Sequence, residues 1–156
     1  MVMICKKIGI DFHGVLNTNP LFFQKFCDMA ISKNVEIHII SGGPRETIEK
    51  FSVIHQIKYS KLWCIFDHFE AKNEVEFLPD GYFHVEDELW NSAKAEYCRR
   101  NEISVQIDDS IIYGRYFTTP YCLYNEKTKT GTLYEKKIFF SHSAEQCLKS
   151  ILNVVS

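Results

Sequence analysis

The sequence lacks any long hydrophobic run. A helix that spans a membrane needs about 20 consecutive apolar residues, and no stretch of the 156-residue chain approaches that length. The opening segment MVMICKKIGIDF has no long apolar core behind a basic start, as a cleaved signal peptide would have, and leads directly into a strand pattern. These absences predict a cytoplasmic protein that is not bound to a membrane.

An excess of charge of either sign is also absent. The chain carries 18 Lys and Arg residues against 20 Asp and Glu residues, a formal net charge of −2. Proteins that bind extended nucleic acid or an anionic membrane surface concentrate positive charge, so we expect neither partner. A pocket for a small phosphorylated ligand remains compatible with this balance, because net charge does not describe individual sites.

The six cysteines have no metal-binding or redox spacing. None of them forms a C-x-x-C pair, so a zinc ribbon or a thioredoxin-type centre has no support. Several fall on apolar faces, where a free cysteine behaves as a small buried hydrophobic residue, which favours a reducing cytoplasmic environment. The 7 Gly and 4 Pro residues form no linker, and we predict a single domain over residues 1–156.

What the sequence does contain is a regular alternation of two hydrophobic patterns. Short apolar runs predict buried strands, and longer stretches with apolar residues at helical spacing predict helices between them. The expected strands are 7–12, 35–40, 62–66 and 104–107. The expected helices begin at Pro20, after Pro44 and after Ser143, and a further one spans Asp87–Arg100 with Leu89, Ala93 and Tyr97 on one apolar stripe. This alternation predicts an α/β fold in which a parallel sheet lies between helices.

Local signals refine this pattern. Asn19 and Ser143 stand where a side chain can cap a following helix. Pro79-Asp80-Gly81 lies between two short strand-like segments and predicts a hairpin. Residues 115–140 predict a further strand and a second hairpin. The expected fold class is therefore α/β with small β-hairpin insertions.

Polar clusters follow three of the predicted strands. The first strand ends in Asp11-Phe12-His13-Gly14, the second in Ser41-Gly42-Gly43-Pro44-Arg45, and a later one in Asp108-Asp109-Ser110. Any one cluster is compatible with an ordinary turn, since Asp, Gly and Ser are common turn residues. The carboxyl ends of parallel strands share one edge of the sheet, where ligands bind. Together the clusters therefore predict a site at that edge.

The residue types in these clusters suit phosphate chemistry. Asp11, Asp108 and Asp109 offer the hard oxygen ligands that Mg²⁺ prefers, although one member of the later pair can instead hydrogen-bond its own loop. An aspartate is also a competent nucleophile toward phosphorus. Ser41 and Gly42 precede a helix, where a hydroxyl and backbone N–H groups can hold phosphate oxygens. A lysine on the helix before the acidic strand, Lys94, can reach the same edge and neutralise charge there.

These residues resemble a known set. Asp11-Phe12-His13-Gly14-Val15, then Ser41, then Lys94, then Asp108-Asp109 are similar to the four motifs of the haloacid dehalogenase (HAD) superfamily of phosphohydrolases. The resemblance covers roughly residues 5–115. It implies a Rossmann-like core with Mg²⁺ at the carboxyl edge, and it makes 67–86 a candidate for a small cap insertion.

The resemblance also implies individual roles. Asp11 would be the nucleophile and a metal ligand, and the backbone carbonyl of His13 would face the metal. Asp109 would complete the metal site, and Asp108 would either bind the metal directly or support a residue that does. Ser41, with Gly42, would bind the transferred phosphoryl group, and Lys94 would steady the aspartyl-phosphate.

One position departs from the family pattern. Phosphatases of this family usually carry a second Asp two residues after the nucleophile as general acid and base, and here that position is His13. An imidazole titrates near neutral pH and can carry out both proton transfers. Three interpretations remain open: His13 substitutes for the Asp, the reaction is slow or altered, or the protein binds phosphate without turning it over.

The leading hypothesis is a Mg²⁺-dependent phosphatase that acts on a phosphate monoester, such as a nucleotide or a sugar phosphate, through an aspartyl-phosphate at Asp11. The alternative is a catalytically impaired phosphate- or metal-binding module with a regulatory or assembly role. A receiver domain of the response-regulator type ranks lower, because such domains place the acidic pair after the first strand. The oligomeric state is left open.

Overall fold

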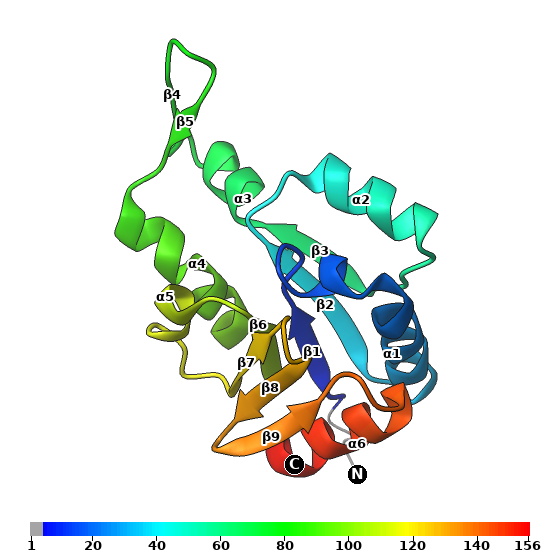
Figure 1. Cartoon of the computed structure of the whole chain (residues 1–156). Helices are drawn as coiled ribbons and strands as arrows, with labels where there is room; N and C mark the ends of the chain where they lie inside the picture. The colour runs from blue at the N-terminus through cyan, green and yellow to red at the C-terminus, as the bar shows by residue number, and fades with distance from the viewer. Residues whose placement is uncertain (1–4) are drawn as a thin grey trace.

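A computed structural model describes residues 5–156 and contains a seven-stranded central sheet (Figure 1). The strand order is β3-β2-β1-β6-β7-β8-β9. The strands are β1 (Lys7–Ile10), β2 (Glu36–Ser41), β3 (Lys61–Cys64), β6 (Val105–Asp108), β7 (Tyr121–Asn125), β8 (Thr130–Leu133) and β9 (Lys136–Phe139). Neighbouring strands from β3 to β7 are parallel, whereas β8 and β9 are antiparallel additions at one edge. The mixed α/β class predicted from the alternation is confirmed.

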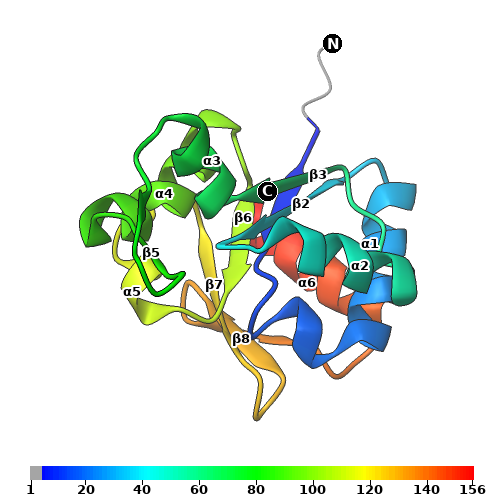
Figure 2. The same cartoon turned by 90° about the horizontal axis from the view of Figure 1, so that it is seen from above.

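Helices cover both faces of this sheet. The helical elements are η1 (Leu16–Thr18), α1 (Pro20–Ser32), α2 (Arg45–Ile54), α3 (Ile65–Ala71), α4 (Asp87–Arg100), α5 (Ile111–Gly114) and α6 (Ala144–Val155). Seen from above, α1, α2 and α6 lie on one side of the sheet and α3, α4 and α5 on the other (Figure 2). Within residues 5–156, no helix has the length and apolar character needed to cross a membrane.

The main core lies on the α1 and α6 side of the sheet. Alternate residues of β1 and β2 point into it, among them Ile8, Ile10 and Ile37, each fully buried.

The two predicted helix caps have different outcomes. Ser143 accepts a hydrogen bond from the backbone N–H of Gln146 at 3.1 Å, as expected. Asn19 does precede α1, but its side chain makes no capping hydrogen bond, so that part of the prediction is wrong.

The third strand is shorter than predicted. The apolar run 62–66 was expected to be one strand, but β3 ends at Cys64 and Ile65 already begins α3. A short apolar run does not distinguish a strand from a buried helical turn. Ile65 is fully buried in a small cluster with Phe69, so the run changes element while remaining in the interior.

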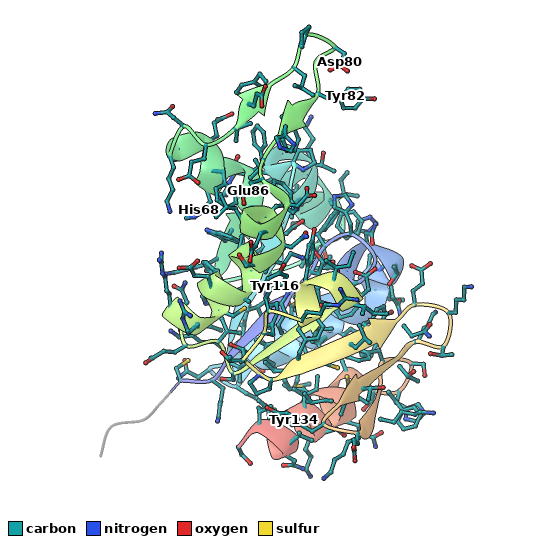
Figure 3. All side chains as sticks on the ribbon, turned by 90° about the vertical axis from the view of Figure 1, so that its left-hand side faces the viewer. His68, Asp80, Tyr82, Glu86, Tyr116 and Tyr134 are labelled. Carbon is teal, nitrogen blue, oxygen red and sulfur yellow. The ribbon has the colours of Figure 1, made fainter. Side chains whose placement is uncertain are left out.

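The predicted hairpin around Pro79-Asp80-Gly81 is present. Its two strands, β4 (Glu76–Phe77) and β5 (Phe83–His84), pair antiparallel. Figure 3 shows Asp80 and Tyr82 at the outer end of this hairpin, beyond the layer of α3 and α4. The second predicted hairpin, β8 and β9, extends the central sheet through β7. The suggestion that 67–86 is a cap stays a prediction.

The order of the parallel strands determines where a ligand site can form. From β1 the chain adds β2 and then β3 on one side, and later returns to add β6 and β7 on the other side. This order is compatible with a Rossmann-like fold, in which ligands bind outside the carboxyl ends of the strands where the direction of strand addition reverses. In this chain that point lies between β1 and β6.

Candidate active site

Two aspartates and a lysine meet at the reversal point. Asp11 follows β1 directly, and Asp108 is the last residue of the adjacent strand β6. Lys94 Nζ donates to Asp11 Oδ1 at 2.8 Å and to Asp108 Oδ2 at 2.9 Å. All three side chains are buried, and Lys94 is only 1% exposed. Residues that are far apart in the sequence therefore form one ionic cluster.

Helix α4 delivers Lys94 to this position. The helix spans the predicted range Asp87–Arg100, with acidic residues in its first turn and two arginines in its last turn, an arrangement that the helix dipole favours. Its buried face differs from the expected stripe, because Leu89 is 41% exposed and the buried residues include Ala93, Lys94 and Ala95. A lysine is almost never fully buried unless it is paired, and here it is paired twice.

Asp108 is held by more than the lysine. Its Oδ2 also accepts a 3.1 Å hydrogen bond from Gln106 Nε2, and its Oδ1 accepts one from the backbone N–H of Ser110 at 3.2 Å. Gln106 and Asp108 share one face of β6 because they are two residues apart in a strand. The sequence reasoning missed Gln106, although this spacing was a usable signal.

Asp109 completes a group of three carboxylates. One carboxylate oxygen from each of Asp11, Asp108 and Asp109 lies within 4.8 Å of the other two. The Asp109 carboxylate also lies directly over Gly14, where a Cβ atom would collide with it. Gly14 has φ +89°, a conformation that residues with a side chain rarely adopt. The glycine therefore leaves room for the carboxylate at this edge.

This donor set fits a hard divalent cation. Octahedral Mg²⁺ holds oxygens at about 2.0–2.1 Å, so opposite ligands lie about 4.2 Å apart. Any three ligands of an octahedron include at least two adjacent pairs, about 3.0 Å apart. The three oxygens, which lie within 4.8 Å of one another, would therefore move inward to bind one ion. Three carboxylates and one ammonium leave two negative charges in excess when all four groups are ionised, which a divalent cation would balance.

The pKa values in the cluster reflect the same imbalance. Burial, with a further contribution from Asp108, raises the pKa of Asp11 to about 8 against the opposing effect of Lys94. Burial alone would lower the pKa of Lys94, but Asp11 and Asp108 outweigh it and raise that pKa. Burial and the charge of Asp108 raise the pKa of Asp109. The metal-free site therefore favours taking up either a proton or a cation.

The loops after β1 and β2 also meet. The ring Nε2 of His13 lies 3.0 Å from the carbonyl oxygen of Gly43. Because a carbonyl oxygen only accepts, Nε2 carries the hydrogen, and Nδ1 of a neutral ring carries the lone pair. Ser41 is fully buried, and its hydroxyl oxygen accepts from the backbone N–H of Gly43 at 3.3 Å. Among the hydrogen bonds of residues 5–156, none joins His13 to the carboxylates.

Two aromatic side chains form a wall over the lysine. Tyr113 lies with its ring centroid 4.8 Å from Lys94 Nζ, within the range of a cation–π contact. Trp90 Nε1 donates to the Tyr113 hydroxyl at 3.0 Å, and the Trp90 ring lies against Gly42. Hydrophobic patterning alone would place Trp90 in the core. Its position four residues before Lys94, on the same helical face, was the signal for a place near the site.

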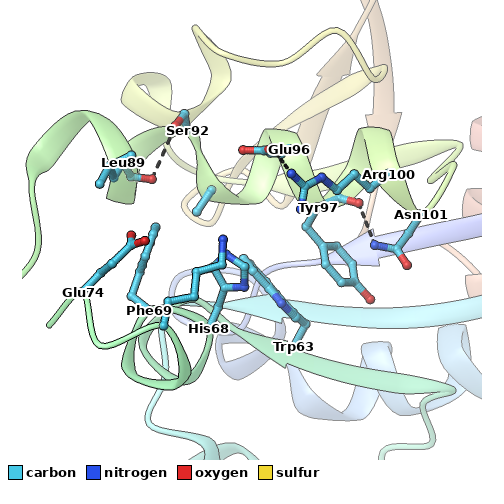
Figure 4. Close-up of a pocket in the computed structure, with 12 residues that line it drawn as sticks. Trp63, His68, Phe69, Glu74, Leu89, Ser92, Glu96, Tyr97, Arg100 and Asn101 are labelled. Atoms are coloured by element: carbon cyan, nitrogen blue, oxygen red, sulfur yellow. Dashed lines mark hydrogen bonds and ion pairs between the residues drawn. The ribbon is translucent and has the colours of Figure 1, made fainter.

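Other candidates lie away from the cluster. Arg45 follows the loop after β2, but its guanidinium donates to Asp67 at 3.2 Å and to the carbonyl oxygen of Leu62 at 2.6 Å. A hollow of about 380 Å³ between α3 and α4 has Trp63 and Tyr97 among its lining residues (Figure 4). None of the acidic cluster residues, nor Lys94, lines this hollow.

Searches against protein-family models and against curated proteins found no match to the chain. The chemistry of the site therefore has to be argued from its own geometry. That geometry is a carboxylate held by a buried ammonium, two further carboxylates, and two loops rich in hydrogen-bonding groups around the same sheet edge.

Proposed function

We propose that this protein is a Mg²⁺-dependent phosphohydrolase of the HAD type, which hydrolyses a phosphate monoester through an aspartyl-phosphate at Asp11. The observation that carries the proposal is the buried Lys94, which bonds Asp11 and Asp108 at the point where strand addition reverses. A buried ion pair contributes little to stability compared with apolar packing. Its presence at this edge is better explained by chemistry that needs an oriented carboxylate beside a fixed positive charge.

In the first step an oxygen of Asp11 attacks the phosphorus atom of the substrate. Lys94 holds Oδ1, so Oδ2 is the attacking atom. The new bond joins Oδ2 to phosphorus, and the bond between phosphorus and the leaving oxygen breaks. Lys94 then neutralises part of the negative charge on the aspartyl-phosphate.

His13 is the proposed carrier of the proton. With Nε2–H donated to Gly43, the exchangeable proton is on Nδ1. Nδ1–H of the charged ring protonates the leaving alkoxide in the first step. In the second step neutral Nδ1 takes a proton from the water that attacks phosphorus, and Asp11 is released as a carboxylate together with inorganic phosphate.

The phosphoryl group would be bound by the loop after β2. The Ser41 hydroxyl accepts from Gly43, so its own O–H remains available to a phosphoryl oxygen. The backbone N–H of Gly42 is the second proposed donor. Asp11, Asp108 and Asp109, with the carbonyl of His13, are the groups that would hold Mg²⁺. When bound, this ion would supply positive charge to the phosphoryl oxygens.

The proposal is tested with Asp11→Asn, which keeps the shape of the side chain but removes the nucleophile. Activity on p-nitrophenyl phosphate with Mg²⁺ should fall at least about a thousandfold. Asp80→Asn at the exposed hairpin tip is the matched control and should keep full activity. Turnover by Asp11→Asn at the wild-type rate would rule out the proposed nucleophile.

The same preparations test the alternative of a binding module. The His13 ring and the Ser41 hydroxyl both hydrogen-bond Gly43. This alternative is favoured because side chains held by the loop in this way are less free to take part in catalysis. Mg²⁺-dependent binding of inorganic phosphate by the wild type, without turnover of any monoester in a broad panel, would support the module and reject the phosphatase.

A further inference from the structure

A groove opens from the acidic cluster along the β7–β8 ribbon, lined by polar side chains and by the exposed side chain of Ile111. A hollow of about 490 Å³ is lined by Asp109 and Gly14 at one end and by residues of β7 and β8 along its length. A second hollow, of about 430 Å³, adjoins it and shares Gly14, Glu126 and Lys127. The groove thus continues outward from a carboxylate of the proposed catalytic site.

The register of the two strands explains the floor of this groove. Asn125 pairs with Thr130, and Leu123 pairs with Thr132, so these four side chains share one face of the ribbon. The alternate residue Leu133 is fully buried on the other face, in the core. Thr130 and Thr132 line the groove with hydroxyl groups, and Asn125 adds an amide.

Aromatic side chains occupy the other side of the cluster. Trp90 packs against Gly42, hydrogen-bonds Tyr113 and lies 5.7 Å, centroid to centroid, from the ring of Phe83. A substrate whose phosphoryl group reaches Asp11 therefore has room for its remaining atoms on the side of Asp109.

The groups in the groove match a neutral ligand with many hydroxyls. The Thr132 hydroxyl makes no hydrogen bond within residues 5–156, and the Thr130 hydroxyl bonds that of Thr128 at 2.7 Å. Asn125 Oδ1 accepts from the backbone N–H of Lys127 at 3.0 Å. Each side chain keeps at least one donor or acceptor that can pair with a sugar hydroxyl.

The charged residues of the lining are Asp109, Glu126 and Lys127, so acidic groups outnumber basic ones and the groove has no excess positive charge for a second phosphate. Tyr124 is the one aromatic residue among those lining these two hollows, and it is 97% covered, so it offers no open face to a nucleobase.

We propose that this groove binds the leaving group of the substrate, and that the substrate is a monophosphate of a sugar or another polyol. This assignment rests on the proposed phosphatase function and narrows it. It gives Thr130 and Thr132 the role of specificity determinants that contact the polyol and take no part in bond breaking.

The test compares kcat/KM for D-glucose 6-phosphate with kcat/KM for p-nitrophenyl phosphate, which has no hydroxyls on its leaving group. Thr132→Val removes one hydroxyl and keeps a β-branched shape that suits a strand. Loss of one hydrogen bond should lower the ratio of the two kcat/KM values by roughly 2- to 12-fold, and Thr130→Val should act in the same direction. Thr47→Val, on the exposed face of α2, is the control and should leave the ratio unchanged.

A ratio that is unaffected by both groove variants, or a wild-type preference for uridine 5′-monophosphate over the sugar phosphate, would overturn the inference while leaving the phosphatase proposal intact. If no monoester is turned over, the phosphatase proposal fails. Calorimetric titration with D-glucose 6-phosphate then decides the groove separately. Binding weakened by Thr132→Val supports it, and absence of binding to the wild type rejects it.

Discussion

Replacing Lys94 with methionine tests whether the buried cluster is built as described. Met has a similar length and no charge, so Lys94→Met leaves Asp11 and Asp108 buried without their shared partner. Breaking a buried pair by removing one member typically costs about 3–5 kcal/mol. For a domain of this size each kcal/mol lowers Tm by about 2–4 °C, so the expected fall in Tm is about 6–20 °C.

The pH dependence makes this prediction specific. The pKa of Asp11 is already raised to about 8 with Lys94 present, mainly by burial, and loss of the lysine raises it further. Above pH 8 the wild-type Asp11 ionises while Asp11 of the variant keeps its proton, so the variant goes on losing stability with rising pH after the wild type has stopped. The destabilisation should therefore be larger at pH 9 than at pH 7. The assay is thermal and urea unfolding in EDTA.

Lys50→Met is the control for this experiment. Lys50 pairs with Glu46 at 2.8 Å on the surface, and an exposed pair of this kind contributes less than about 1 kcal/mol. A Lys94→Met protein as stable as Lys50→Met, or a loss that is equal at both pH values, would refute the buried cluster.

Three further predictions concern the carboxylates and the adjacent glycine. Mg²⁺ at about 100 times its Kd should stabilise the wild type by about 2.7 kcal/mol, measured as a rise in Tm. Asp109→Asn should abolish this rise in Tm, and the control Asp80→Asn should keep it. Equal rises in the two variants would exclude the proposed metal site. The pKa of Asp11 is raised from 3.8 to about 8. Between these two pH values the folded protein without Mg²⁺ binds one more proton than the unfolded chain. Its free energy of unfolding should therefore fall with rising pH by up to about 1.4 kcal/mol per pH unit. Asp11→Asn should remove this slope in urea titrations at pH 5 to 8, and an unchanged slope would contradict the assignment. Gly14→Ala should lose the Mg²⁺ shift, because its new Cβ would collide with the Asp109 carboxylate. Gly81→Ala is the control, since Gly81 has a similar positive φ with no atom within 4 Å, and both variants lose about 1–2 kcal/mol of stability to the strained backbone. An intact Mg²⁺ shift in Gly14→Ala would contradict the close approach of Asp109 to Gly14.

The convergence of the strand ends was predictable because it follows from topology. Parallel strands share a carboxyl edge, so residues after β1 and β6 had to lie near one another once the strands were recognised. Helix α4 was predicted with the correct bounds, 87–100. The acidic first turn and basic last turn mark both ends of that helix in the sequence.

The details of the site that could not be predicted depend on contacts between segments that are distant in the sequence. Lys94 was expected at this edge from its place among the motifs, but a lysine on an amphipathic helix is ordinarily solvated, and no local signal marks it as buried between two aspartates. The Trp90–Tyr113 hydrogen bond joins residues 23 apart, on different helices. The direction of the His13 ring depends on where the β2 loop presents its Gly43 carbonyl. Each of these features is decided by packing, which hydrophobic periodicity does not encode.

The central claim is that Asp11 carries the phosphoryl group, and a covalent trap tests it most directly. Wild-type protein incubated with Mg²⁺ and a turnover substrate is quenched in the steady state and reduced with borohydride, which converts an aspartyl-phosphate to homoserine. Peptide mass spectrometry should find homoserine at position 11 and unmodified aspartate at positions 108 and 109. Rapid turnover with no modification at Asp11, or with modification at a different aspartate, would contradict the account.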